Sequence, residues 1–389
     1  MQKTSTISLG LLFALALLTA SGPFSIDLYL PGLPQVAAEL ATSKVQWTLS
    51  SFMLGMACGQ LGVGALSDTY GRKRFLIAGA GIALVAAIGC AFAPSIGMLI
   101  SARFFQGIGA GMCVVLARSV IPDLMEGVAA AKAFSWMMIV GGIAPALAPV
   151  VGAFLIDFMS WRGIFLVLVA IAFLQMMVVI FFIPETRPPS ARTPFNISAF
   201  SEVARNRTFL FFCGSFALGF GTLFSYISSA SIIIQQIMGY SPKIFALVFA
   251  INSLGLMSGG FINTKLLDRY PPSSILRGAL VVVLLAVGVL STAGLVRAHH
   301  FVLFAALFFA IAPLSVVMGN ATTIALGAVR ARAGSASALL GCGQFLMAGL
   351  VSAIAPLGSY PPAMMVASMA VCATGALCLS SLGRRSISA

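Results

Sequence analysis

The sequence predicts an all-α membrane protein with twelve transmembrane helices in two pseudo-symmetric six-helix halves. Three observations predict it: the composition, the length of the apolar runs and the distribution of cations. Of the 389 residues, 60% are hydrophobic and only 8% are charged, whereas soluble domains carry about a quarter charged residues. No water-soluble fold of this length could bury so much apolar surface, so lipid must surround most of the chain.

Twelve apolar runs are long enough to cross a bilayer, which takes about 20 residues of α-helix. They cover residues 7–32, 45–66, 74–93, 95–116, 133–156, 163–183, 209–236, 243–264, 275–296, 300–323, 335–357 and 361–382. The first run imitates a secretory signal peptide. We interpret it as a span because it continues to Leu33 and carries an acidic residue that a cleaved segment would not need.

The cations predict the orientation. An even number of spans places both termini on one side, and 17 of the 22 Lys and Arg fall on that side. The exceptions are Lys44, Arg162, Lys243 and Arg297 on the other side, and Arg103 within a span. Cytoplasmic loops are enriched in Lys and Arg, so both termini are expected in the cytoplasm. This topology explains the net charge of +13 without a nucleic-acid partner.

A polar, proline-rich stretch divides the chain. We predict an N-terminal six-helix bundle over residues 1–183, a cytoplasmic linker over 184–207 with a short amphipathic helix near 197–205, and a C-terminal six-helix bundle over 208–389. The halves also repeat. The frame of Leu66, Asp68 and Tyr70 after the second run returns as Leu266, Asp268 and Tyr270 after the eighth. Duplicated six-helix halves are typical of transporters with a central cavity.

Asp27 and Arg103 are the two charges that cannot easily reach water at a helix end. A charge at the bilayer centre is costly, so such residues usually face a cavity and mark an ion or substrate path. If Asp27 and Arg103 lie close together, a change in their separation changes the proton affinity of Asp27, which a proton-exchange site requires. The alternatives are that the first span ends early and leaves Asp27 among lipid headgroups, and that Arg103 forms a structural ion pair or lies at a helix end.

Two segments are candidates for gating. In the loop after the second span, Gly64 permits close helix contact, Gly71 permits a tight turn, and Asp68 can accept hydrogen bonds from Arg72 or from a neighbouring helix N-terminus. The alternative is that the loop's cations only fix topology. In the fifth span, Pro145, Pro149 and Gly152 predict a bent helix with a smooth face. Its alternative is a static kink.

Candidate substrate contacts in the second half are less specific. Phe216, Phe220 and Phe224 recur every four residues beside Tyr226, and they form either an aromatic wall for an apolar drug or a stripe that packs on lipid or helices. Asn252, Asn320 and Gln344 lie inside spans and are either substrate contacts or hydrogen bonds between helices. We interpret His299 and His300, at a helix edge, as solvated.

Several segments together resemble one family. Residues 64–74 resemble the loop signature of the major facilitator superfamily; Leu99, Arg103, Gln106, Gly107 and Gly109 resemble a signature of its proton-coupled members. Pro149 and Gly152 resemble the antiporter signature, with Ala148 and Ala153 where glycines are usual. Three further segments are similar to motifs of the Bcr/CflA group. They contain Asp27, Tyr29, Leu30, Pro31 and Pro34 in the first segment, Trp161, Arg162, Ile164 and Phe165 in the second, and Pro184, Glu185 and Thr186 in the third.

The resemblance implies a proton-coupled antiporter of a bacterial inner membrane that exports phenicol- and bicyclomycin-type antibiotics. Asp27 would be the proton or substrate carboxylate and Arg103 its partner, and Tyr29 and Gln106, from the same motifs, are candidate substrate contacts. The expected partners are a small molecule, protons and the bilayer, and the expected state is a monomer. An importer of a nutrient and an exporter of a metabolite remain as alternatives.

No enzyme is predicted. The sequence has no nucleophile elbow, no phosphate loop and no paired His and Asp with metal-ligand spacing. The seven cysteines include no C-x-x-C pair. We therefore expect no catalytic residue, no metal site and no cofactor.

Overall fold

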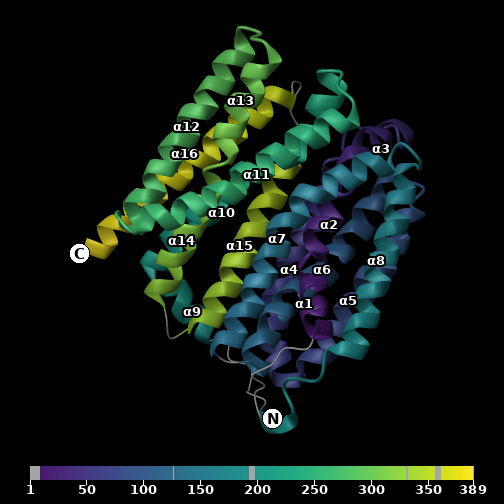
Figure 1. The fold of residues 1–389 in the computed structure, drawn as a ribbon, viewed down its shortest axis with the longest axis vertical. Helices are drawn as coiled ribbons and strands as arrows, with labels where there is room; N and C mark the ends of the chain where they lie inside the picture. Colours follow the sequence, from purple (N-terminus) through teal and green to yellow (C-terminus); the bar gives the residue numbers. More distant parts are fainter. Residues whose placement is uncertain (1–8, 126, 192–197, 330–331, 355–360, 389) are drawn as a thin grey trace. The chain divides into compact units, whose positions relative to one another are not determined.

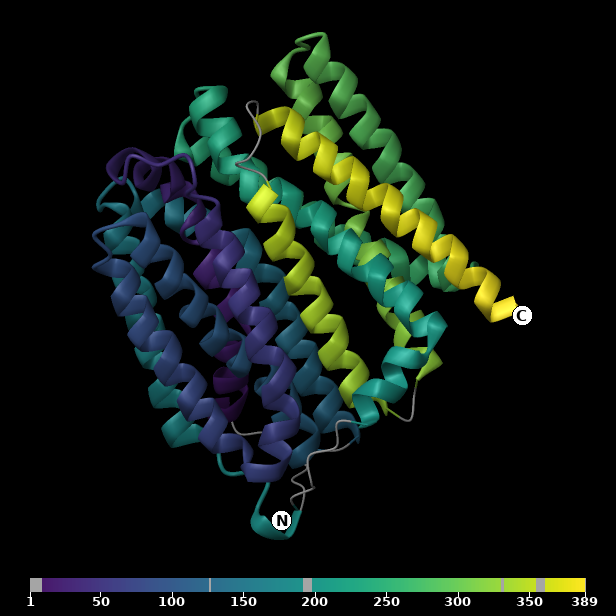
Figure 2. The same cartoon turned by 180° about the vertical axis from the view of Figure 1, so that it is seen from behind.

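The computed structural model describes residues 9–125, 127–191, 198–329, 332–354 and 361–388. Over these ranges it is helical and contains no strand. The chain forms two compact units, residues 1–196 and 197–389, and their boundary falls within the stretch predicted as a linker. Figures 1 and 2 show that the long helices of each unit run side by side.

The first predicted span is a broken helix. It comprises α1 (Leu9–Thr19), α2 (Ser21–Asp27), the 3-10 turn η1 (Leu30–Gly32) and α3 (Leu33–Glu39). The axis bends by 41° between Thr19 and Ser21. The sequence explains this break, because Pro23 has no N–H to donate to the carbonyl oxygen of Thr19 and its ring clashes with that carbonyl.

The remaining helices of the N-terminal unit cover the predicted spans two to six. They are α4 (Trp47–Tyr70), α5 (Arg72–Ala91), α6 (Ile96–Leu124), α7 (Gly127–Leu155) and α8 (Trp161–Phe182), followed by the short 3-10 turn η2 (Pro189–Ala191). α6 continues eight residues past the predicted end of the fourth span at 116. Both prolines of the fifth span, Pro145 and Pro149, lie inside α7, which is one continuous helix.

The C-terminal unit begins with α9 (Ser198–Arg205), the short helix predicted near 197–205. It continues with α10 (Arg207–Ile232), the π-helical turn η3 (Ile233–Ile237), α11 (Pro242–Leu267), α12 (Pro272–Leu295), α13 (His300–Ile311), α14 (Leu314–Ala328), α15 (Ala333–Ile354) and α16 (Pro361–Ser388). Pro313 separates α13 from α14 within the tenth predicted span.

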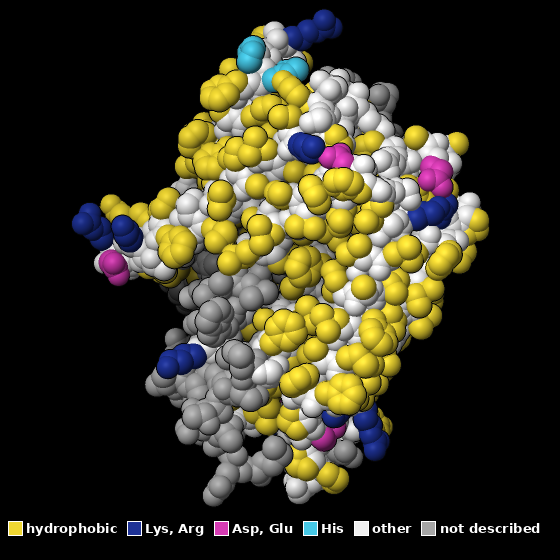
Figure 3. Space-filling view, turned by 45° about the vertical axis from the view of Figure 1, so that its right-hand side comes forward, with side chains coloured by type: hydrophobic (Ala, Val, Ile, Leu, Met, Phe, Trp, Pro, Cys, Tyr) yellow, Lys and Arg dark blue, Asp and Glu magenta, His cyan; other side chains and the backbone are white. Residues whose placement is uncertain are grey.

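The helices match a membrane protein. Each of the twelve predicted intervals coincides with a helix or a broken helix. Among the described residues, nine helices are long and apolar enough to cross a bilayer, and ten are if the bent first span counts as one. The other two predicted intervals correspond to α4 and α7. Within α7, the part Gly141–Leu155 is a shorter apolar helix. Figure 3 shows a face covered largely by apolar side chains, with charged side chains in a few small groups.

Glycines bring α4 and α6 into backbone contact. A Cβ atom at Gly55 would lie 2.1 Å from the carbonyl oxygen of Phe104, and one at Gly107 would lie 2.1 Å from that of Phe52. Only glycine permits helices to approach this closely. The contact places Phe52 beside Arg103.

A polar clasp joins α3, α5 and α8 at one end of the N-terminal unit. Trp161 Nε1 donates to Glu39 Oε2 at 2.6 Å, and Arg162 Nη2 pairs with Glu39 Oε1 at 2.9 Å. Arg162 also donates to the carbonyl oxygen of Ala93, just past the end of α5. The Trp161 backbone N–H, at the start of α8, donates to Gln35 Oε1. The clasp fixes α8 and therefore Phe165, which lies one turn further along.

Candidate functional site

Arg103 lies on α6 in the interior of the N-terminal unit and is fully buried. Its Nη1 donates to the carbonyl oxygen of Ser25 at 2.9 Å and to Gln106 Oε1 at 2.7 Å. The guanidinium carbon lies 4.3 Å from the ring centroid of Phe52 and 5.4 Å from that of Tyr29, which are cation–π distances. Its Nε and Nη2 have no hydrogen-bond partner among the described residues.

Asp27 is the last residue of α2 and only 4% exposed. No ion pair joins it to Arg103, and no hydrogen bond joins its carboxylate to another residue in the described part of the chain. The first span does not end there, because the chain continues through η1 and α3 as far as Glu39. A carboxylate and a guanidinium are therefore buried on neighbouring helices without neutralising each other.

Tyr29 belongs to the same cluster. It is fully buried, its hydroxyl lies 3.5 Å from Thr48 Oγ1, and its ring centroid lies 4.9 Å from that of Phe165. Gln106 also accepts a weak bond from Cys90 Sγ at 3.9 Å. The structure thus brings together Tyr29, Arg103 and Gln106.

The proline–glycine segment of α7 contacts the first span beside Asp27. A Cβ atom at Gly152 would lie 2.2 Å from the carbonyl oxygen of Leu28. Pro149, one turn earlier, is buried, and Pro145 is half-buried. Of the gating candidates in α7, Gly152 therefore has direct access to the backbone of the Asp27 segment.

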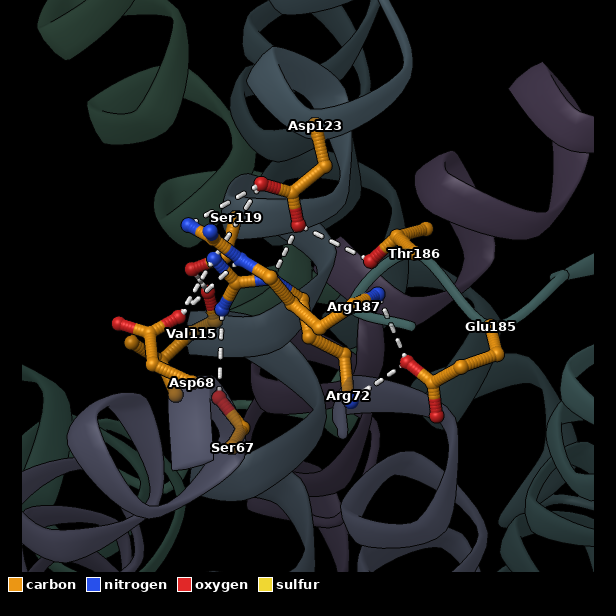
Figure 4. A network of polar contacts seen from close by, with 9 residues as sticks. All are labelled: Ser67, Asp68, Arg72, Val115, Ser119, Asp123, Glu185, Thr186 and Arg187. Atoms are coloured by element: carbon orange, nitrogen blue, oxygen red, sulfur yellow. Dashed lines mark hydrogen bonds and ion pairs between the residues drawn. The ribbon is translucent and has the colours of Figure 1, made fainter. Parts of the chain in front are cut away.

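A second polar cluster surrounds Arg72 at the end of the unit where α4 meets α5 (Figure 4). Arg72 Nη2 pairs with Asp68 Oδ1 at 2.9 Å, as predicted, and Arg72 Nη1 donates to Ser67 Oγ at 3.2 Å. Arg72 Nε pairs with Asp123 on α6. The sequence predicted that Asp68 accepts from Arg72 or from a helix N-terminus; the N-terminal N–H of α5, from Arg72, instead donates to Glu185 Oε1 at 2.9 Å.

The segment after α8 completes this Arg72 cluster. Thr186 Oγ1 donates to Asp123 Oδ2 at 2.9 Å, and Arg187 Nη2 lies 3.5 Å from Asp123 Oδ1. Arg187 Nε lies 3.6 Å from Asp68 Oδ1. Two arginines and two aspartates therefore link the ends of α4, α5, α6 and α8. Gly71 has φ 102°, which confirms the turn that the sequence assigned to a glycine.

Asp123 and Arg187 were not among the candidates from sequence. Asp123 was missed because the fourth span was predicted to end at 116, whereas α6 keeps its helical period to Leu124. Arg187 directly follows Pro184, Glu185 and Thr186, a segment already singled out, and this adjacency was the available signal. The surroundings of Gly64, a further gating candidate in α4, lie outside the described residues.

The candidates of the C-terminal unit form contacts between helices. Asn252 Nδ2 donates to Tyr226 Oη at 3.0 Å, and Asn320 Nδ2 donates to Asn263 Oδ1 at 2.6 Å. Gln344 is half-buried on α15. Phe220 stacks on Phe224 with centroids 5.8 Å apart and meets Phe345 of α15 edge to face, whereas Phe216 packs on the buried core of the unit.

The interpretation of His300 as solvated was wrong. It is half-buried, and its Nδ1 lies 2.8 Å from Tyr240 Oη, because the chain after η3 turns back over the start of α13. His299 stays exposed and accepts from the backbone N–H of Phe301. Within the described residues, no group of three or more His, Cys, Asp or Glu is arranged to hold a metal ion.

Comparison with protein families decides the assignment. The model of the Major Facilitator Superfamily matches residues 15–356. The chain belongs to this superfamily. Its members are transporters, so this major facilitator protein is a multi-pass membrane transporter of small molecules and not an enzyme.

Relatives of this major facilitator protein agree with the Bcr/CflA resemblance. It is 29% identical to a bicyclomycin resistance protein homolog of Haemophilus influenzae over 95% of this chain and 94% of the relative. It is 30% identical to the multidrug resistance protein MdtL of Escherichia coli over 94% of this chain and 93% of that relative. The structure of the xylose transporter XylE from Escherichia coli superposes with a TM-score of 0.74 at 14% identity, covering 95% of each chain; this likeness shows the fold.

Proposed function

We propose that the protein is a proton-coupled antiporter that exports small drug-like molecules, of the phenicol and bicyclomycin type, across a bacterial inner membrane by alternating access. The observation that carries the proposal is the buried carboxylate of Asp27, which forms no ion pair with any described residue although Arg103 is buried on the neighbouring helix α6. The names of the relatives, bicyclomycin and multidrug resistance proteins, support drug export.

Asp27 is the proton carrier in this proposal. A buried carboxylate must be neutralised by a cation or a proton. Arg103 Nη1 bonds to Ser25 and Gln106, and no ion pair joins Arg103 to Asp27, so a proton is the species left to neutralise Asp27 in this state. Arginine keeps its own proton and therefore does not compete for the one that is exchanged.

Arg103 supplies the free donors. Its Nε and Nη2 are buried and have no partner among the described residues, and leaving such groups unsatisfied is costly. A hydrogen-bonding group on the exported molecule, or Asp27 after a small movement of α2, would satisfy them. Asp27 accepts from these donors best as the carboxylate, so a movement of α2 towards Arg103 favours release of its proton.

The Arg72 cluster is the proposed gate element, and both termini are proposed to be cytoplasmic. The cluster joins the ends of α4, α5, α6 and α8, so these helices move as one body when the transporter changes state. Gly152 of α7 lies against Leu28, so a movement of α7 is transmitted to the Asp27 segment.

Drug accumulation in cells that produce the protein tests the proposal. A labelled phenicol should accumulate less in producing cells than in cells without the protein, and an uncoupler that collapses the proton gradient should remove the difference. Greater accumulation in producing cells would show import, the first alternative. If several antibiotics are tested and the accumulation of each is the same with and without the protein, export of a metabolite, the second alternative, is favoured.

A further inference from the structure

The C-terminal unit contains a cavity that the proposed function does not use. It has a volume of about 880 Å³ and lies between α10, α12, α13 and α16, where α12 ends and α13 begins. Cavities that bind small molecules have volumes of about 300–1,000 Å³. All of its lining residues belong to the C-terminal unit, so it is separate from the Asp27 and Arg103 cluster.

The cavity is apolar and opens towards the outer surface of α12. Its interior is lined by side chains such as Ile234, Val287 and Leu307, whereas Gly288 and Gly294 of α12 line it and are exposed. Leu295, next to this opening, is 82% exposed. In a multi-pass membrane protein such an apolar outer surface contacts lipid chains, so the cavity opens towards the bilayer.

The polar groups of the cavity gather at one end. Arg297 and His300 line this end, and Tyr240 holds His300 through the contact of 2.8 Å between Tyr240 Oη and His300 Nδ1. None of the residues that line the cavity is acidic. Figure 3 shows His side chains beside Lys or Arg side chains at the top of the view, with apolar side chains below them.

The interior offers few polar contacts to a drug-like molecule. Tyr226 reaches the wall, but its hydroxyl already accepts a hydrogen bond from Asn252. Ser291 is the other polar side chain of the wall away from the basic end. Specific sites for compact drugs combine an apolar wall with several convergent polar groups, and this cavity instead separates one apolar compartment from one cationic end.

That separation matches an amphiphile with an anionic head. A guanidinium binds phosphate oxygens through two parallel hydrogen bonds, and an apolar compartment open to the bilayer accepts an acyl chain. We propose that the cavity binds an anionic phospholipid, with one acyl chain between α10, α12 and α16 and the phosphate at Arg297. The proposal does not depend on which substrate the transporter carries.

Two glycines allow the cavity to be filled without a steric clash. A Cβ atom at Gly288 or at Gly294 would meet no other atom within 4 Å. Leucine at either position therefore extends into open space. Gly260 of α11 is the matched control, because it has the same free surroundings and does not line the cavity.

Photo-crosslinking tests the site. The purified protein is placed in phosphatidylcholine nanodiscs that contain a few per cent of phosphatidylglycerol with a diazirine on one acyl chain, and labelled residues are located by mass spectrometry. We expect labelling of α12 and α13 within residues 284–307. Arg297→Gln should lower this labelling several-fold, and Gly288→Leu and Gly294→Leu should each remove most of it. Arg269→Gln, at an exposed arginine between α11 and α12, and Gly260→Leu should leave it unchanged.

A matched probe distinguishes head from chain. With diazirine phosphatidylcholine in place of phosphatidylglycerol, Arg297→Gln should lower labelling much less, because the choline cation offsets the charge of the phosphate. Equal labelling by the two lipids in the wild type, or labelling that survives both Gly288→Leu and Gly294→Leu in protein that remains monodisperse, would overturn the proposal. A drug of the phenicol type that displaces the lipid from this cavity at concentrations that saturate transport would assign the cavity to the substrate and overturn it as well.

Discussion

Arg103 Nη1 of α6 donates a hydrogen bond of 2.9 Å to the carbonyl oxygen of Ser25 of α2, two residues before Asp27. This bond fixes the cation to the backbone of the Asp27 segment and not to its carboxylate. The two charges therefore lie on neighbouring helices without forming an ion pair. In the proposed mechanism, a small shift of α2 breaks this bond and brings Asp27 towards Nε and Nη2 of Arg103, which have no hydrogen-bond partner among the described residues.

Gln106→Leu should loosen this contact between α2 and α6. It removes one of the two acceptors of Arg103 Nη1 and leaves a buried donor less satisfied, so we expect a loss of about 1–3 kcal/mol in the free energy of unfolding. A lower melting temperature of the purified protein checks it. Gln344→Leu removes an amide from a half-buried position in α15 and should not shift the melting temperature; a shift of equal size would contradict the assignment.

Gly152→Ala should push α7 away from the first span. Its Cβ atom would lie 2.2 Å from the carbonyl oxygen of Leu28, and overpacking of this kind costs about 1–3 kcal/mol. The measurements are the melting temperature and the export rate, both of which should fall. Gly141→Ala on the same helix places its Cβ atom at an ordinary 3.8 Å from Thr19 Cγ2 and serves as the control. Equal effects of the two variants would show that the Leu28 contact is unimportant.

Gly71→Ala and Gly81→Ala should change stability in opposite directions. Gly71 has φ 102° between α4 and α5, so alanine there is strained by about 1–3 kcal/mol. Gly81 lies inside α5 in open space, where alanine should stabilise the helix by about 0.5–1 kcal/mol. Thermal unfolding of the two variants beside the wild type measures both changes in stability. A stabilised Gly71→Ala variant would be inconsistent with this turn.

Asp123→Asn should destabilise the protein more than Asp68→Asn. Asp123 is nearly buried and contacts both Arg72 and Arg187, and removing one member of a buried pair costs about 3–5 kcal/mol. The Asp68 side chain is 35% exposed, so its pair contributes about 0–1 kcal/mol, and Asp68→Asn should slow turnover while substrate binding persists. Thermal unfolding and paired binding and transport assays measure these effects.

Asp268 provides the control for the Arg72 cluster. It occupies the corresponding place in the second half, is exposed, and has no ion pair with another described residue. Asp268→Asn should therefore leave both stability and transport unchanged. Lost binding with normal turnover in Asp68→Asn would argue against a gating role for the cluster.

Local patterns in the sequence predicted the helices and part of the site. Apolar runs located the spans because a bilayer demands long apolar helices, and the loop after the second span predicted that Asp68 can accept from Arg72, which the ion pair of 2.9 Å confirms. Gly71 was assigned to a turn because only glycine adopts a positive φ at little cost.

Contacts between distant residues could not be predicted in this way. Arg103 and Ser25 are 78 positions apart, and Arg72 and Asp123 are 51 apart, so no periodicity of the sequence links them. Their meeting depends on how α2, α5 and α6 pack. The contact between Tyr240 and His300, 60 positions apart, was missed for the same reason.

Drug-driven proton flux in energised inside-out membrane vesicles tests the central claim most directly. The wild type is measured beside Asp27→Asn and the control Asp268→Asn with a panel of phenicols and other antibiotics. The account predicts that a transported drug dissipates the pH gradient in the wild type and in Asp268→Asn, and that it has no effect in a folded Asp27→Asn protein. Unchanged drug-driven flux in Asp27→Asn would contradict the assignment of Asp27 as the proton carrier.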